Sequence, residues 1–217
     1  MSVATTASDP WSAAAWAARW AALWQALGAP APHAVDELLA RYDEPHRAYH
    51  TRTHLAECLA RFDTARSRAA RPAEAECALW YHDAVYDPRA ADNEARSADL
   101  AAVAMARAGL APEAIDRVRA LVMATRHEAV PDSLDAALVV DADLGILAAE
   151  AARYAEYERA VRAEYAWVPL PVFRARRAAI LEVFLQRPRL FTSGAFDADE
   201  ARAHSNLAHA ISALRDR

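Results

Sequence analysis

Two histidines, His50 and His54, lie four residues apart in the stretch AYHTRTHLAE, residues 48–57. Four residues is about one turn of an α-helix, so both imidazole rings are expected on the same face. The chain has only eight histidines, and this pair has two interpretations. The rings either lie there by chance, on the surface or in the core, or they provide part of a metal site whose other ligands come from elsewhere in the chain.

The dipeptide His82-Asp83 ends an apolar stretch and could supply two of those ligands. His82 follows Leu79 by three residues, so its ring is expected to face the core. A buried imidazole beside a buried carboxylate needs partners, and a shared cation would satisfy both groups. The alternative is that Asp83 pairs with an arginine or caps the following loop.

Asp141 and Asp143, in the stretch VVDADLGIL, could supply the remaining ligand because apolar residues flank them on both sides. They are two residues apart and therefore point in different directions in a helix or a strand. Only one of them is expected to join a shared site. A helix N-cap is the competing role for either aspartate.

Composition excludes several kinds of chemistry. The 217 residues include no lysine, which removes both Schiff-base catalysis and the P-loop lysine. The four glycines are scattered, so no glycine-rich loop can cradle a dinucleotide. A net charge of −5 argues against a broad basic surface for nucleic acid.

The sequence also predicts the cellular compartment of the protein and the state of its cysteines. No apolar run approaches the roughly 18–20 residues that cross a membrane, and the first residues lack a signal-peptide pattern, so a cytoplasmic protein is expected. Cys58 and Cys77 fall inside apolar helical patterns and are expected to be buried, reduced thiols.

The sequence predicts a single all-α domain over residues 1–217, since alanine is abundant and glycine is rare. Trp16, Trp20 and Trp24 form a stripe on the first helix that requires burial, either in this chain's core or against a partner subunit. That helix is expected to be capped by Ser8 or Asp9, with Pro10 in its first turn, and to stop at Gly28 and Pro30. The later helices are predicted at 33–42, 51–68, 73–83, 92–108, 112–126, 137–150, 150–165, 171–186 and 198–215. The segment 137–150 begins like a strand, but no second strand is available to pair with it.

The ordered set of a histidine, a His-Asp pair and a later aspartate resembles the HD superfamily of metal-dependent phosphohydrolases, whose ligands come from successive helices of an all-α fold. The likeness covers about residues 41–165, and the metal-site core is expected there. The resemblance implies that the metal ligands are His54, His82, Asp83 and Asp143, with Asp143 preferred to Asp141. The segments that are together similar to one branch of predicted HD phosphohydrolases are RYDEPHRAYHTRTHL, LWYHDAVYDP, DNEARSADLA, ATRHE, DADLGIL and YERAVRAEY.

A second resemblance implies a separate role for His50, the first histidine of the pair. YHTRTHLAE resembles the YHNxxHAxDV stretch of cyclic-nucleotide phosphodiesterases, in which the second histidine binds metal and the first protonates the leaving oxygen. The resemblance implies that His50 is the general acid, acting beside the catalytic metal ligand Asp83. After the His-Asp pair those enzymes carry a further histidine and an asparagine, whereas this chain reads HDAVYDPRAADNE. Their specificity for cyclic nucleotides therefore does not carry over.

A ligand set of two imidazoles and two carboxylates favours Mn, Fe, Co, Ni or Zn over Mg. One or two such ions are expected. Such an ion would lower the pKa of bound water and polarise a phosphoryl group, and a histidine can deliver a proton near neutral pH.

Several neighbours are candidates for substrate contact or for support of the ligands, each with an ordinary structural role as its alternative. His127 could hold a second metal or contact substrate, or it could be a surface residue at a helix end. Asn93 and Glu94 could orient water or substrate, or simply start a helix. The same choice applies to Asp141 and to three arginines that could clamp a phosphate: Arg47, Arg52 and Arg96.

The expected function is hydrolysis of a phosphate monoester or diester, on a small nucleotide-like molecule, without nucleic-acid or membrane partners. A homodimer is one option for its assembly. Two other functions remain open: a non-catalytic HD module that senses a nucleotide or a metal, and a lyase or oxygenase that uses two irons on the same scaffold.

Overall fold

The computed structural model describes residues 11–216, which form ten α-helices and no strand. The prediction of an all-α fold is therefore confirmed. The helices are α1 Ala13–Ala26, α2 Val35–Tyr42, α3 Arg52–Ala65, α4 Pro72–Tyr81, α5 Asn93–Arg107, α6 Pro112–Ala124, α7 Leu134–Asp143, α8 Ala151–Glu164, α9 Leu170–Leu185 and α10 Glu200–Arg215.

Most predicted boundaries agree with these bounds to within a few residues, and the differences have local causes. Helix α1 begins after Ser12, whose hydroxyl accepts a hydrogen bond from the Ala15 amide. The predicted caps Ser8 and Asp9, and Pro10, lie outside the described residues. The helix predicted over 51–68 ends at Ala65, and a 3-10 turn follows it. The segment predicted as helix despite its strand-like start is helical as α7, and a 3-10 turn over Leu144–Ala148 continues it.

The tryptophan stripe of α1 is buried within this chain. Trp16, Trp20 and Trp24 are 3%, 3% and 1% exposed. The Trp20 ring meets the edges of Trp24 and Trp80 at centroid distances of 5.4 and 5.1 Å, and its Nε1 donates to the His33 carbonyl at 3.1 Å. Helix α1 therefore covers the core of its own subunit through α4, which answers the question that the sequence left open.

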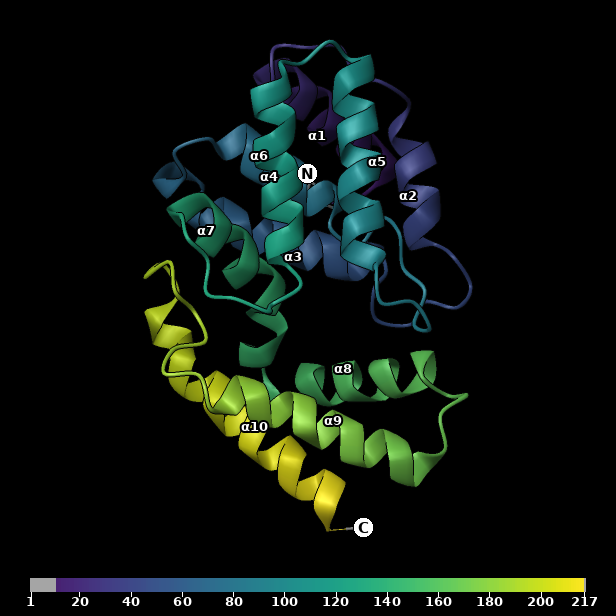
Figure 1. Ribbon diagram of the computed structural model, residues 1–217, viewed down its shortest axis with the longest axis vertical. Coiled ribbons are helices and arrows are strands. Elements are labelled where there is room, and N and C mark those ends of the chain that lie inside the picture. Colours follow the sequence, from purple (N-terminus) through teal and green to yellow (C-terminus); the bar gives the residue numbers. More distant parts are fainter. Residues whose placement is uncertain (1–10, 217) are drawn as a thin grey trace, which may run out of the picture.

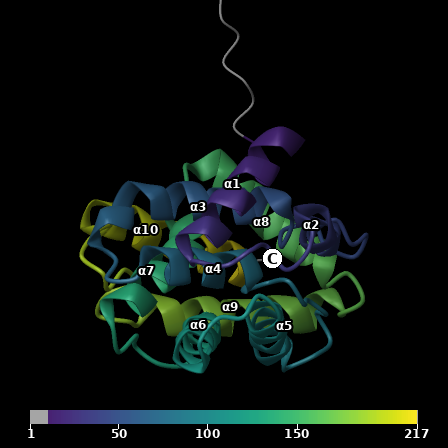
Figure 2. The ribbon, with the colours of Figure 1, turned by 90° about the horizontal axis from the view of Figure 1, so that it is seen from above.

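Helices α1–α7 make up one part of the molecule and α8–α10 the other, as Figure 1 shows. Helices α5 and α6 pack side by side, and α9 packs along α10. Seen from above, α5 and α6 point along the line of sight whereas α9 runs across it (Figure 2). Helix α7 and its 3-10 turn lead from the first part to the second (Figure 1). This connection leads the chain into α8, α9 and α10.

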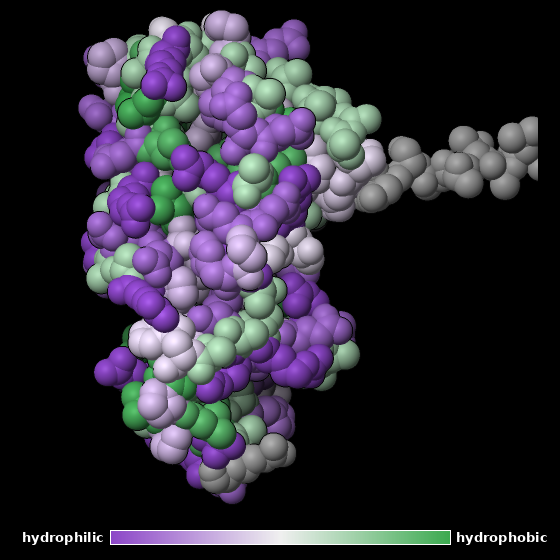
Figure 3. All heavy atoms as spheres, turned by 90° about the vertical axis from the view of Figure 1, so that its right-hand side faces the viewer, coloured by the Kyte–Doolittle hydropathy of each residue, from purple (hydrophilic) through white to green (hydrophobic). Residues whose placement is uncertain are grey.

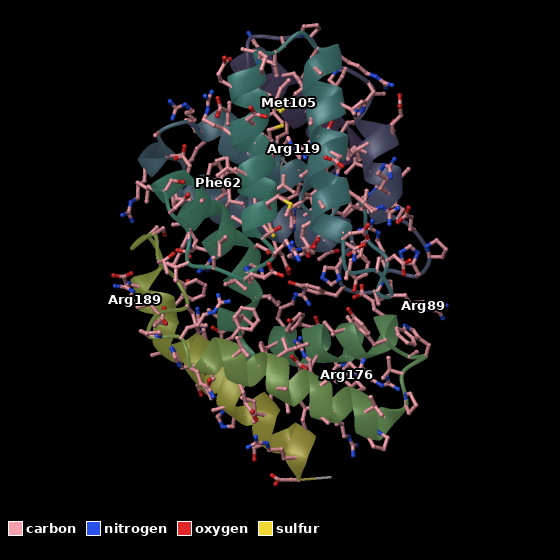
Figure 4. The ribbon with its side chains drawn as sticks, viewed as in Figure 1. Phe62, Arg89, Met105, Arg119, Arg176 and Arg189 are labelled. Atoms are coloured by element: carbon pink, nitrogen blue, oxygen red, sulfur yellow. The ribbon has the colours of Figure 1, made fainter. Side chains whose placement is uncertain are left out.

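One cluster of buried side chains runs through the molecule from Trp16 to Ile211. Phe62 and Met105, which are labelled in Figure 4, belong to it and have no exposed surface. On the outside, polar and apolar side chains are intermixed over the face in Figure 3. None of the helices in residues 11–216 combines the length and the apolar composition that crossing a bilayer requires.

Replacing Trp20 by alanine should lower the free energy of unfolding by about 3–5 kcal/mol, because the cavity left beneath α1 cannot close completely. Chemical denaturation of the purified variant measures this change. The control is Trp167→Ala at a residue that is 50% exposed, which should cost less than about 1 kcal/mol. Equal losses in the two variants would contradict a structural role for α1 in this core.

Candidate metal centre

Three helix ends in the first part of the molecule bring the predicted ligands together. His54 lies in the first turn of α3, His82 and Asp83 follow directly on the last residue of α4, and Asp143 is the last residue of α7. The three helices pack against one another, as the centre of Figure 1 shows. The packing of α3, α4 and α7 thus brings side chains from three helix ends to one place.

The four side chains meet at distances that suit a single ion. His54 Nε2 lies 3.1 Å from His82 Nε2, 3.2 Å from Asp143 Oδ1 and 3.4 Å from Asp83 Oδ2. His82 Nε2 lies 3.1 Å from Asp83 Oδ2 and 3.5 Å from Asp143 Oδ1. Nitrogen and oxygen ligands bonded to one metal at about 2.0–2.2 Å are themselves about 3.0–3.5 Å apart. The observed separations therefore leave room for one ion among the four groups.

The tautomer of His82 supports the same interpretation. Its Nδ1 donates to the Leu79 carbonyl at 2.7 Å, and a carbonyl oxygen can only accept. In the neutral ring the proton is thus on Nδ1, and Nε2 presents its lone pair to Asp83 and Asp143. A metal ion bound among these groups would accept this lone pair, in the place of the ring protons that otherwise bridge the histidines and the carboxylates.

The charges of the four groups are strongly coupled. Burial acts to lower the pKa of His54, but the neighbouring Cys58 and the hydrogen bonds to Asp143 and Asp83 raise it well above its usual range. For His82, Asp83 and the hydrogen bond to Asp143 outweigh burial in the same direction. Burial acts to raise the pKa of both carboxyls, yet the histidines hold both well below the usual range. The site therefore favours two negative carboxylates with positive charge between them. The two imidazoles supply this charge here, and a divalent ion would take the place of their protons.

His50 does not join these four groups but pairs with Glu164, the last residue of α8. Its Nδ1 donates to Glu164 Oε2 at 2.8 Å, and the Tyr86 hydroxyl donates to the same oxygen at 2.8 Å. The other oxygen, Oε1, accepts from the amides of Ala48, Tyr49 and His50 at 2.8–3.0 Å. Glu164 therefore fixes both the ring and the backbone of the residue predicted to be the acid.

Glu164 was not among the residues expected at the site, although the sequence carries a signal for it. Tyr154, Tyr157, Val161 and Glu164 recur every three or four residues, which places the acid on the buried face of α8. A carboxylate at the end of an apolar stripe requires a partner. Its partner, His50, is 114 residues away, and the sequence offered no means of finding it.

His127 lies beside the four groups in a strained backbone conformation. Its φ is +57°, which is rare for a residue other than glycine. This conformation follows the end of α6 and brings Nε2 to 2.9 Å from Asp143 Oδ2. Arg187 donates to the His127 carbonyl, and the buried Nδ1 of His127 has no hydrogen-bond partner among the described residues. Backbone strain of this kind is typical of functional positions, and it favours a role at the site over the alternative of a surface residue.

A cavity of about 530 Å³ opens onto these residues. His50, Asp83, His127 and Asp143 all line it, together with apolar side chains of α9 and with Arg187, which follows that helix. Asn93 and Glu94 also line it. Asn93 is held by hydrogen bonds to both the amide and the carbonyl of Asp87, so it shapes the wall of the cavity and caps the loop before α5.

Four candidates from the sequence, Asp141, Arg47, Arg52 and Arg96, do not line this cavity, so the structure does not support the contact with substrate that was expected of them. The Asp141 carboxylate is fully buried and accepts from the amides of Thr192 and Ser193 at 2.9 and 2.8 Å. It therefore anchors the segment after α9. The side chains of Asp141 and Asp143 point in different directions, as their spacing of two residues predicts.

The arginines predicted to clamp a phosphate have structural partners. Arg47 is buried and donates to the carbonyls of His50 and Asp83 at 3.0 and 2.7 Å, so it ties the two loops of the site together. Arg52 pairs with Asp43 near the surface, and Arg96 is exposed on α5. The arginines that line the cavity are Arg126, Arg177 and Arg187. Arg126 directly precedes His127 in the segment ATRHE, whereas Arg177 and Arg187 lie outside the quoted motifs.

No family model, no curated protein and no solved structure matches this chain. Its function is therefore argued from the chemistry and geometry of this site.

Asp143→Asn should lower the affinity for a bound transition metal at least about tenfold, because a ligand oxygen is replaced by an amide. Asp141→Asn should leave metal binding unchanged, since that side chain contacts only Thr192 and Ser193. Metal titration of both variants makes the comparison. Loss of metal from the Asp141 variant alone would reverse the assignment of the two aspartates.

Glu164 should make stability depend on pH in the acid range. Burial acts to raise its pKa, but the hydrogen bond and charge of His50, together with the backbone amides, lower it to about 2 from 4.5. A lowered carboxyl pKa stabilises the fold fully above about pH 4.5, and this stabilisation is lost as the pH falls towards 2. Glu164→Gln should remove up to about 3 kcal/mol of this pH-dependent part.

Denaturation with urea at a series of pH values between 6 and 3 measures how the free energy of unfolding of the wild type and of Glu164→Gln changes with pH. The matched control is Glu156→Gln, on the exposed side of the same helix, which should keep the dependence of the wild type. A Glu164→Gln variant that loses as much stability on acidification as the wild type would contradict this account.

Proposed function

We propose that this protein is a metal-dependent phosphohydrolase of the HD type that acts on a small, nucleotide-like phosphate ester. The observation that carries the proposal is the convergence of His54, His82, Asp83 and Asp143 beside a cavity that also contains His50. Two imidazoles and two carboxylates would hold one divalent ion of Mn, Fe, Co, Ni or Zn in preference to Mg. When bound, such an ion would activate water and polarise the phosphoryl group.

His50 has the arrangement required of the general acid. Because its Nδ1 donates to Glu164, its Nε2 is the nitrogen that would carry a proton to the leaving oxygen. The Tyr86 ring, stacked on the imidazole with the two centroids 4.1 Å apart, holds the plane of the His50 ring. A base or acid oriented by a third group is the general pattern of such catalytic pairs.

The cavity is consistent with a substrate of nucleotide size. Its volume of about 530 Å³ falls within the range of about 300–1,000 Å³ found for small-molecule sites. Tyr86, Tyr165 and Phe184 offer aromatic surface for a planar group, and Arg126 and Arg187 offer positive charge for the phosphate. The unpartnered Nδ1 of His127 is a further group to which a substrate or a second ion could bind.

Elemental analysis of the wild type beside the variant His82→Ala/Asp83→Ala tests the proposal most directly. The wild type should hold about one or two transition-metal ions per chain, and the variant should hold none. The metal found then defines the conditions for a screen of phosphate monoesters and diesters. A wild type that takes up no Mn, Fe, Co or Zn would show that these residues are structural.

The variant His50→Gln distinguishes a hydrolase from a protein that only binds its ligand. If His50 is the acid, the variant should keep its metal and lose about 10²–10⁴-fold in kcat, the usual contribution of a positioned acid. Tight nucleotide binding by the wild type without product, under every metal tried, would instead favour the non-catalytic sensor.

A further inference from the structure

Cys58 lies one helical turn after His54 on α3, on the same face. Its side chain is only 1% exposed, and its Sγ lies 3.6 Å from His54 Nδ1 and 3.7 Å from His54 Nε2. One donor atom from each of His54, Cys58, His82 and Asp143 can be chosen so that all four lie within 4.8 Å of one another. The thiol is thus close enough to the metal centre to take part in it.

The distance from Cys58 to His54 is close to that between two ligands of one ion. Sulfur and nitrogen bonded to one ion at about 2.3 and 2.0–2.1 Å are about 3.1–3.6 Å apart, depending on the angle, and the 3.7 Å between Cys58 Sγ and His54 Nε2 is just longer than this range. As a hydrogen bond to imidazole this contact would be weak, because a thiol is a poor donor. The Cys58 sulfur therefore gains little from His54 alone and more from a shared cation.

The position of Cys58 relative to the cavities supports ligation. With His54 and Asp143, it lines a second cavity of about 210 Å³, whereas His50 and Asp83 line the cavity of about 530 Å³. Asp143 borders both cavities. A sulfur on the side of the smaller cavity could bind the ion without occupying the larger one, in which the substrate is proposed to lie.

We propose that Cys58 is a protein ligand of the metal centre, beside His54, His82 and Asp143. This inference rests on the proposed metal site and adds to it a soft donor that the four-residue set lacks. The sulfur–metal bond forms as the thiol proton passes to solvent. Because thiolate favours Zn, Co, Fe and Ni over Mn and Mg, Cys58 narrows the choice of metal that two histidines and two aspartates leave open.

Cobalt-loaded protein tests the proposal without any assay of activity. A thiolate bound to Co²⁺ gives an intense charge-transfer absorption in the near ultraviolet, which nitrogen and oxygen ligands do not give. The wild type should show this band at about one equivalent of cobalt. Cys58→Ser should lose it while retaining bound cobalt, and should lose at least about tenfold of the preference for zinc over manganese.

Cys77→Ser is the matched control, because Cys77 is the second cysteine of the chain and is also fully buried, on α4. This variant should keep the band. If Cys58→Ser fails to fold, a band retained in Cys77→Ser still assigns the sulfur to Cys58, since no other cysteine remains.

The outcomes separate the two proposals. Bound cobalt without the charge-transfer band, or a band that Cys77→Ser abolishes, would overturn ligation by Cys58 and leave the four-ligand centre standing. A protein that binds no cobalt, as measured by elemental analysis, would refute the metal centre and Cys58 ligation together.

Discussion

The structure depends on placing each of two imidazoles within 3.5 Å of each of two carboxylates at the ends of buried helices. Unpaired charges in such a place would be costly, and even a good pair barely offsets its own desolvation. The arrangement is tolerable because opposite charges compensate each other there and because a cation can complete the set. Helices α3, α4 and α7 must therefore end at the same point, and the packing of the first part of the molecule serves this requirement.

A second layer of hydrogen bonds holds the site in place. The Leu79 carbonyl fixes the ring of His82, and Arg47 ties the carbonyl of His50 to that of Asp83. Glu164 comes from α8, in the other part of the molecule, and holds three amides and the His50 ring. Helices α8 and α9 thus do more than close the cavity. Helix α8 positions the residue proposed to carry the proton, and this links the packing of the second part directly to the proposed chemistry.

The two cavities divide the neighbourhood of the site into two environments. On the larger side, aromatic rings and arginines surround His50 and His127, which suits recognition and proton transfer. On the smaller side lies the sulfur of Cys58, in contact with His54. Asp143 faces both. Under the proposed function, the choice of metal and the choice of substrate would be made largely by different residues.

The sequence by itself determined the helices, the burial of the tryptophan stripe and the rule that only one of Asp141 and Asp143 could face a shared site. These features follow from spacings within one or two turns, where the geometry of the helix leaves little choice. Only the tertiary structure decided that Glu164 partners His50, that Arg47 binds loops instead of phosphate, and that Arg126 and Arg187 line the cavity. The physical reason is that such contacts join residues far apart in the chain. They depend on the directions in which packed helices cross, which no local spacing specifies.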